Sequence, residues 1–168
     1  MSREVWEMLG KYRELTLHDF VVDNVVIGDN SFTLYSVNGH EVMVELEGDC
    51  FSQSSFDRDS IEELRGLFGH RVITMRDAHA GRIDWETDHR YGEPALVRTQ
   101  RVSNLSVEPG YLHPDLHAEA KFKGECVSAH FLVIDTDKGG YSIAWRNDSN
   151  GYYDGWPNFF VDGEKAER

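Results

Sequence analysis

The C-terminal third of the chain constrains the fold more than any other part. Two apolar, β-branched runs are separated there by the polar, glycine-containing segment 137–140. Asp and Gly are typical of tight turns, because they adopt backbone conformations that most other residues avoid. We therefore predict a hairpin with strands at residues 128–135 and 140–146, followed by a turn at residues 147–151. A hairpin requires an antiparallel sheet.

A second hairpin is predicted at Asn38-Gly39, which lies between the alternating runs 32–37 and 41–46. Asn-Gly between two such runs is a strong hairpin pattern. Because successive residues of a strand point to opposite faces, one face of the second strand is apolar and the other is mostly acidic. The core-facing residues are Val42, Val44 and Leu46, and the outward residues are Glu41, Met43, Glu45 and Glu47.

Two short helices are also expected, at residues 2–14 and 58–68, because apolar residues recur there at helical spacing. The second has a candidate capping box, Ser60 with Glu63, and Gly69 as its C-terminal stop. Its apolar stripe consists of Ile61, Leu64, Leu67 and Phe68.

These elements predict an α+β fold. It is mainly an antiparallel sheet of about five to seven strands, a common sheet size, with the two helices. Further strands are expected at residues 71–76 and near 95–107, and residues 163–168 are expected to form a frayed tail. A chain of 168 residues fits a single domain covering residues 1–168.

The charge excludes some function classes. The formal net charge is −13, from 17 basic and 30 acidic residues, which is the opposite of the basic surface of a nucleic-acid binder. The acidic sheet face, formed by Glu41, Glu45, Glu47 and Asp49, can attract a basic protein surface. The alternative is that the acidic excess only keeps the surface solvated.

Location and redox state follow from the apolar runs and the cysteines. No apolar run approaches the roughly 18 residues of a membrane span, and the first residues lack the apolar centre of a signal peptide. The sequence therefore predicts a cytoplasmic protein without a membrane partner. Its two cysteines, Cys50 and Cys126, are expected to be reduced thiols.

One motif resembles a metal site. His113-Pro-Asp-Leu-His117 places two histidines four residues apart with Asp115 between them, which suits one metal ion on a helix. There is no third ligand at a recognisable spacing, so a polar loop is the alternative and no cofactor is predicted. The calcium-like segments 135–139 and 148–151 lack the closing glutamate of an EF-hand, and their Asp, Asn and Gly residues suit turns.

Two other clusters are candidate sites. Asp84, Glu86, Asp88 and His89 surround Trp85 and include groups able to transfer protons, although a solvated loop has the same composition. The aromatic end, formed by Tyr152, Tyr153 and Trp156 and followed by Phe159 and Phe160, is either a binding platform or a part of the core.

Four blocks of the chain form a pattern when they are taken together. They are Asp49-Cys50; Ile61, Leu64 and Leu67-Phe-Gly69; Thr136, Lys138-Gly139, Tyr141, Ile143 and Trp145; and Ser149-Asn-Gly-Tyr-Tyr153. This pattern resembles a small uncharacterised domain family found in bacteriophage and prophage genomes. The resemblance implies an α+β sheet with one or two helices and a phage-like context, but no activity. The chain has Cys50-Phe51 where the family has paired cysteines, and residues 78–126 form a longer insertion.

Three hypotheses follow. The favoured one is a non-enzymatic, acidic, phage-type accessory protein that binds a host protein with a basic surface, such as a defence or nucleic-acid-processing protein. The second is a small-ligand binder or metal-dependent enzyme with its site in the insertion, involving Asp84, His89, His113, Asp115 and His117. The third is a virion-related structural protein that self-assembles through exposed strand edges.

Overall fold

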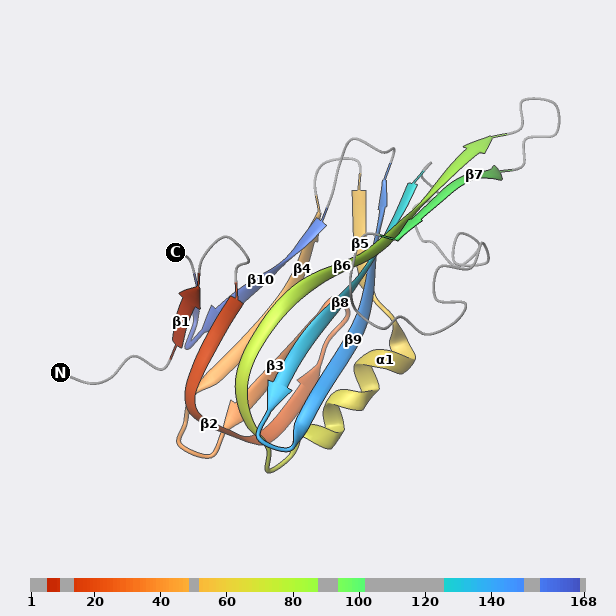
Figure 1. The fold of residues 1–168 in the computed structure, drawn as a ribbon. Helices are drawn as coiled ribbons and strands as arrows, with labels where there is room; N and C mark the ends of the chain where they lie inside the picture. Colours follow the sequence, from red (N-terminus) through yellow and green to blue (C-terminus); the bar gives the residue numbers. More distant parts are fainter. Residues whose placement is uncertain are drawn as a thin grey trace.

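The computed structural model describes residues 6–9, 14–48, 52–87, 94–101, 126–149 and 155–166. These residues form a predominantly β fold with eleven strands and a single short helical segment (Figure 1). The expected α+β fold with two helices is therefore wrong. The strands are β1 (Trp6–Leu9), β2 (Glu14–Ile27), β3 (Ser31–Ser36), β4 (Glu41–Gly48), β5 (Ser52–Phe56), β6 (Arg71–Thr87), β7 (Pro94–Arg101), β8 (Cys126–Thr136), β9 (Gly139–Ser149), β10 (Gly155–Val161) and β11 (Glu164–Lys165). The helical segment is α1 (Arg58–Glu62), continued by the 3-10 turn η1 (Glu63–Leu67).

The strands pair in the order β11-β10-β4-β3-β2-β6-β8-β9-β5, with β1 added to β2 and β7 to β6. Strand β2 is the corner of this sheet. Its first half pairs with β1 and β6, and its second half pairs with β3. The register shifts twice along β2, and such bulges bend a strand and increase its twist. The sheet consequently curls, so that β3 and β4 lie behind β6, β8 and β9 in Figure 1.

The core fills the inside of this curled sheet. Its largest fully buried side chain is Trp145, and Leu132, Ile134 and Ile143 are 0% exposed beside it. Segment α1–η1 covers one side of the core with three buried residues, Ile61, Leu64 and Leu67. A smaller apolar cluster, separate from this core, consists of Ala129, Phe131, Val133 and Ala144. All residues from 129 to 134 are buried, so β8 is covered on both faces.

One end of the strand path, β5, approaches β4 and β10 beside a pair of glycines. Gly48 of β4 lies opposite Gly155 of β10 in the antiparallel register. A Cβ atom at Gly155 would lie 2.0 Å from Ser54 Oγ and 2.6 Å from Asn147 Nδ2. The Ser54 hydroxyl also donates a 3.0 Å hydrogen bond to the Glu47 carbonyl. The missing side chains therefore let β5 approach β4 and β10 closely.

The predicted N-terminal helix, residues 2–14, is a second error within the described residues. Residues 6–9 form β1, which pairs antiparallel with β2 from Trp6 opposite Leu17 to Leu9 opposite Glu14. An isolated helix of this length is marginal in water, and Gly10 weakens it further. Pairing with β2 satisfies the backbone of β1 instead, and this pairing is not visible in the helical spacing of the apolar residues.

The second predicted helix exists but differs in detail. Its N-cap is Asp57, whose carboxylate accepts a 3.0 Å hydrogen bond from the Ser60 amide, so the proposed Ser60–Glu63 capping box is wrong. The Ser60 hydroxyl instead accepts a 2.7 Å bond from the Ala144 amide and so attaches α1 to β9. Phe68, expected in the apolar stripe, is 68% exposed. Gly69 ends the segment with φ +78°, as predicted.

Both hairpins are confirmed, as strands β3–β4 and β8–β9. Several other segments differ from expectation. Residues 147–149, predicted as part of a turn, belong to β9, and β5 was not predicted. Strand β6 continues to residue 87 instead of ending at residue 76, and β10 was not predicted. Where a frayed tail was expected, β11 pairs with β10 and Ala166 is 3% exposed.

Candidate functional site

Strand β4 presents acidic side chains on the face that points away from the core. The alternating burial of its residues confirms the predicted orientation. Glu45 and Glu47 are exposed, and Glu41 is half-buried. The sequences of β3, β4 and β10 contain no lysine or arginine to neutralise these carboxylates within the strands.

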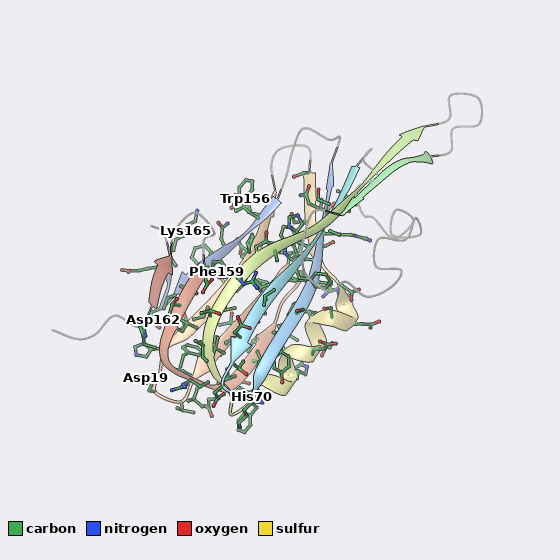
Figure 2. All side chains as sticks on the ribbon, in the orientation of Figure 1. Asp19, His70, Trp156, Phe159, Asp162 and Lys165 are labelled. Atoms are coloured by element: carbon green, nitrogen blue, oxygen red, sulfur yellow. The ribbon has the colours of Figure 1, made fainter. Side chains whose placement is uncertain are left out.

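Strand β10 adds aromatic side chains to the same face. The antiparallel register places Trp156 opposite Glu47 and Phe160 opposite Met43. Directly opposed residues of an antiparallel pair lie on one face of the sheet. Phe159 is 3% exposed and lies on the core face, whereas Trp156 projects outward at the end of β10 in Figure 2. Of the aromatic end, Phe159 therefore belongs to the core, whereas Trp156 and Phe160 point outward.

The face continues onto β3, where Tyr35 lies opposite Glu41 and is 37% exposed. The carboxylates of β4 therefore lie between an aromatic ring on β3 and two aromatic rings on β10. We call this surface the acidic–aromatic face and define it by Tyr35, Glu41, Glu45, Glu47, Trp156 and Phe160.

Two sets of contacts fix the position of β10 on β4. The carboxylate of Asp162 accepts a 2.9 Å hydrogen bond from the Glu41 amide and lies 2.8 Å from His40 Nδ1. Nearer the other end of the pair, the buried side-chain amide of Asn158 donates to Glu47 Oε2. These contacts fix β10 relative to β4 and so set the spacing between the two strands of the face.

A polar cluster that the sequence did not predict lies inside the curled sheet. Trp145 Nε1 donates a 2.9 Å hydrogen bond to Asp77 Oδ1, and His130 Nδ1 lies 3.1 Å from Asp77 Oδ2. The His130 ring stacks on the Trp145 indole with centroids 3.9 Å apart. Since a carboxylate only accepts hydrogen bonds, the Nδ1 atom of His130 donates the proton. The residues come from β6, β8 and β9, so only the strand pairing brings them together.

Strand β9 also buries an ion pair. Asp148 Oδ2 lies 3.7 Å from Arg146 Nε, and the Asp148 side chain is 2% exposed. Burial raises the pKa of Asp148 from 3.8 to about 6, although the Arg146 guanidinium opposes this shift. The alternation of apolar and polar residues along β9 gave no indication that Asp148 would be buried.

Several predicted site residues lie outside the described part of the chain. They are Asp49, Tyr152, Tyr153, Asp88, His89, His113, Asp115 and His117. Asp84 lies on β6, in a part of the strand whose side chains are not described. Among the described residues, no three His, Cys, Asp or Glu side chains gather in a way that could hold a metal ion.

Comparison of the chain with protein-family models, curated proteins and solved structures finds no match in any of the three. The resemblance to a phage domain family therefore remains a prediction. Within the described residues, no helix is long and apolar enough to cross a membrane.

Proposed function

We propose that the protein acts by binding a second protein through the acidic–aromatic face. The observation that supports this most directly is the register that places Trp156 opposite Glu47. Tyr and Trp are enriched among the residues that dominate the energy of protein interfaces, because they bury a large area at little entropic cost. Trp156 is partly exposed on the outward sheet face, so a part of its surface is still available to a partner.

The partner proposed for this face is a protein with a basic surface. Three carboxylates lie on one strand of the face, and its strands contain no basic residue. The chain as a whole has a net charge of −13, which adds long-range attraction for a cationic partner. This charge distribution favours fast, salt-sensitive association.

Within this proposal, the partner is a bacterial protein of host defence or nucleic-acid processing, and the chain is a phage-type accessory protein. Proteins that act on nucleic acids present basic surfaces to the phosphate backbone. An acidic sheet face with partly exposed rings offers such a surface both negative charge and stacking area, the two features that a nucleic acid offers. The protein would thus compete with the partner's substrate.

Affinity capture with a matched set of variants tests this function. The parent, Glu45→Lys, Trp156→Ala and the control Glu63→Lys are each used to capture partners from a bacterial lysate at low and high salt. Glu63 is an exposed glutamate of η1, away from the acidic–aromatic face. The control makes the same change in net charge as Glu45→Lys. Any difference in partner binding between the two variants therefore results from the position of the substitution and not from the net charge.

The expected result is a basic protein captured by the parent and by Glu63→Lys, lost at high salt, and lost with both face variants. The dissociation constant of the purified pair should rise by about tenfold or more for each face variant, the usual effect at a central interface position. A partner that binds Glu45→Lys and Trp156→Ala as tightly as the parent would overturn the proposal.

A further inference from the structure

Trp156 and Glu47 form a pair on the acidic–aromatic face that a partner can reach from solvent. They lie directly opposite each other in the register of β10 on β4, so both side chains are on the outward face. Opposed residues of an antiparallel pair have Cβ atoms about 4.5–5.5 Å apart. Glu47 is exposed and Trp156 is partly exposed, and Trp156 projects at the end of β10 in Figure 2. An indole ring and a carboxylate are therefore accessible at one point of the surface.

The Glu47 carboxylate is held in place by a buried side chain. Asn158 lies two residues from Trp156 on the same face of β10, is 3% exposed, and donates its side-chain amide to Glu47 Oε2. An ionised carboxylate can accept about four hydrogen bonds, so most of its capacity remains after this one. No lysine or arginine within the described ranges lies within ion-pairing distance of Glu47. The carboxylate is thus oriented but not neutralised.

We propose that Trp156 and Glu47 together bind an arginine side chain of the partner. The assignment rests on the proposed function, and it names the side chain that the partner contributes at this position. The guanidinium pairs with the Glu47 carboxylate and stacks its flat side on the indole of Trp156. Asn158 is a positioning residue, because it contacts Glu47 and not the guanidinium.

Arginine fits this pair better than lysine does. The guanidinium is planar, so it can donate two parallel hydrogen bonds to a carboxylate and lie against an aromatic ring at the same time. It is also more weakly hydrated than an ammonium group, so its contact with the indole costs less desolvation. A lysine ammonium can make the charge contact but neither of the planar ones. The pair therefore selects for arginine within a basic surface.

Glu45 extends the site along β4. It lies two residues from Glu47 on the same face and is exposed. Alternate residues of a strand are about 7 Å apart. An extended partner segment with two arginines separated by one residue has the same spacing as these two carboxylates. One arginine then binds Glu47 and Trp156, and the other pairs with Glu45.

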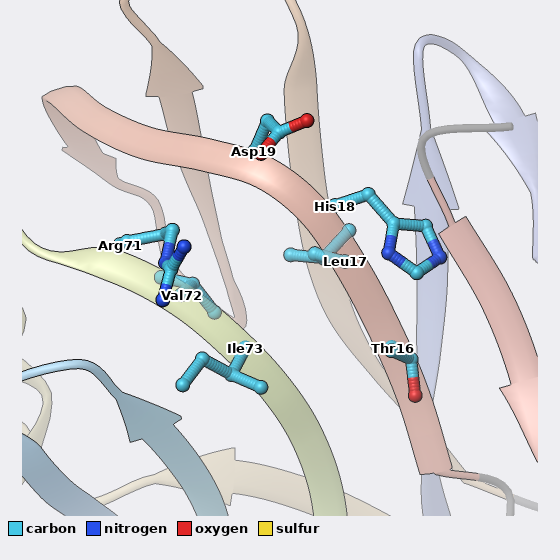
Figure 3. A pocket seen from close by; sticks show the side chains of 7 residues that line it. All are labelled: Thr16, Leu17, His18, Asp19, Arg71, Val72 and Ile73. Atoms are coloured by element: carbon cyan, nitrogen blue, oxygen red, sulfur yellow. The ribbon is translucent and has the colours of Figure 1, made fainter. Parts of the chain in front are cut away.

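A pocket between β2 and β6, lined in part by Asp19, does not provide a comparable site (Figure 3). It forms where residues 17–19 of β2 face a single residue of β6, Ile73. Two of its lining side chains, Leu17 and Val72, are 4% and 0% exposed. The pocket therefore offers a ligand little accessible surface, whereas the pair on the acidic–aromatic face is open.

The test is an NMR titration of the whole chain at low ionic strength with two peptides of equal charge, acetyl-Arg-Gly-Arg-amide and acetyl-Lys-Gly-Lys-amide, at millimolar concentrations. The backbone amides and the indole N–H of Trp156 report the binding site. With the arginine peptide we expect saturable shifts of this indole and of the amides at residues 45–47 and 156–158. The lysine peptide should bind about two- to fivefold more weakly, because it lacks the stacked contact on an exposed ring.

Two variants separate the ring from the carboxylate. Trp156→Leu removes the ring but keeps an apolar side chain, so the two peptides should bind this variant equally. Glu47→Gln removes the charge but keeps an acceptor for Asn158, and it should weaken the arginine peptide by about two- to fivefold. Glu63→Gln removes one exposed carboxylate from η1 and is the matched control for net charge. It should leave both affinities unchanged.

Any of four outcomes would overturn the arginine assignment. They are the absence of saturable shifts with either peptide, equal binding of the two peptides to the parent, an arginine preference that persists in a folded Trp156→Leu variant, and a loss of affinity in Glu47→Gln no larger than in Glu63→Gln. Dispersed amide spectra establish that each variant is folded. Failure of the proposed function is a separate result. The lysate capture can yield a basic partner even when the two peptides bind equally, and it can yield none when the arginine peptide binds.

Discussion

Asp148 and Arg146 form a buried ion pair two residues apart on β9, with 3.7 Å between Oδ2 and Nε. Burial nevertheless raises the pKa of Asp148 from 3.8 to about 6, so the desolvation of the carboxylate outweighs the attraction of the guanidinium. The native state then binds a proton more tightly than the unfolded chain does. The contribution of Asp148 to stability is greatest below about pH 4 and falls as the pH rises towards 6.

Asp148→Asn should remove this pH dependence. Two pKa units correspond to about 3 kcal/mol. The free energy of unfolding of the variant relative to the parent should therefore rise by up to about 3 kcal/mol between pH 4 and pH 7. Urea unfolding at the two pH values measures the change, with Asp23→Asn, an exposed aspartate of β2, as the control. If the difference in unfolding free energy between variant and parent is the same at both pH values, the raised pKa of Asp148 is contradicted.

Asp77→Ala should destabilise the fold by about 3 kcal/mol, because the indole N–H of Trp145 and Nδ1–H of His130 lose their acceptor inside the sheet. Asp77→Asn should cost less, since its side-chain oxygen can still accept from Trp145. Urea unfolding at pH 7 measures both changes. Asp23→Ala is the control, and a loss in Asp77→Ala no larger than in this control would show that the cluster contributes nothing to stability.

The N-cap of α1 provides a test in which the expected change in stability is smaller. Asp57→Ala should lower the free energy of unfolding by about 1 kcal/mol, because the Ser60 amide loses its acceptor at the start of the helix. Asp59→Ala is the matched control, since Asp59 is an exposed aspartate in the same turn. Equal losses in the two variants, measured by thermal or urea unfolding, would rule out Asp57 as the cap.

Sequence reasoning predicted the parts of the fold that depend on neighbouring residues. The hairpin at Asn38-Gly39 and the helix stop at Gly69 follow from backbone chemistry within a few residues. The helix wrongly predicted at residues 6–9 has a different cause. Strand β1 forms because it pairs with β2, and this pairing does not depend on neighbouring residues alone. Strand β10 was missed for the same reason: its stability comes from β4, which is distant in the sequence.

The candidate site divides in the same way, into features that neighbouring residues determine and features that strand pairing determines. Alternation along β4 predicted that Glu45 and Glu47 point outward, whereas composition left the aromatic end near Trp156 open between a surface platform and a part of the core. That these residues share one face depends on the register of β10 on β4. No pattern among neighbouring residues predicts that register, and none predicts that Asp77 lies beside Trp145. The pocket at Asp19 is also invisible in the sequence, because it results from a mismatch between two strands.

The glycine pair Gly48 and Gly155, beside which β5 approaches β4 and β10, provides the most direct test of the fold. A Cβ atom at residue 155 would lie 2.8 Å from the Glu47 carbonyl oxygen and 2.0 Å from Ser54 Oγ. Gly155→Ala should therefore cost about 3 kcal/mol or more, as overpacking against backbone does. Gly66→Ala is the control, because its new Cβ would lie 3.4 Å from the nearest atom, and it should cost little or stabilise.

A double variant separates the two contacts at this point. Ser54→Ala removes the nearest atom, Oγ, but leaves the Glu47 carbonyl in place. In the Gly155→Ala background it should therefore restore only part of the lost stability, whereas in the parent it should destabilise by about 1 kcal/mol through its hydrogen bonds with Asn147 and the Glu47 carbonyl. Urea unfolding of all four proteins gives the coupling between the sites. Additive effects would mean that β5 does not approach β10 as closely as the structure shows, because two residues in contact must couple.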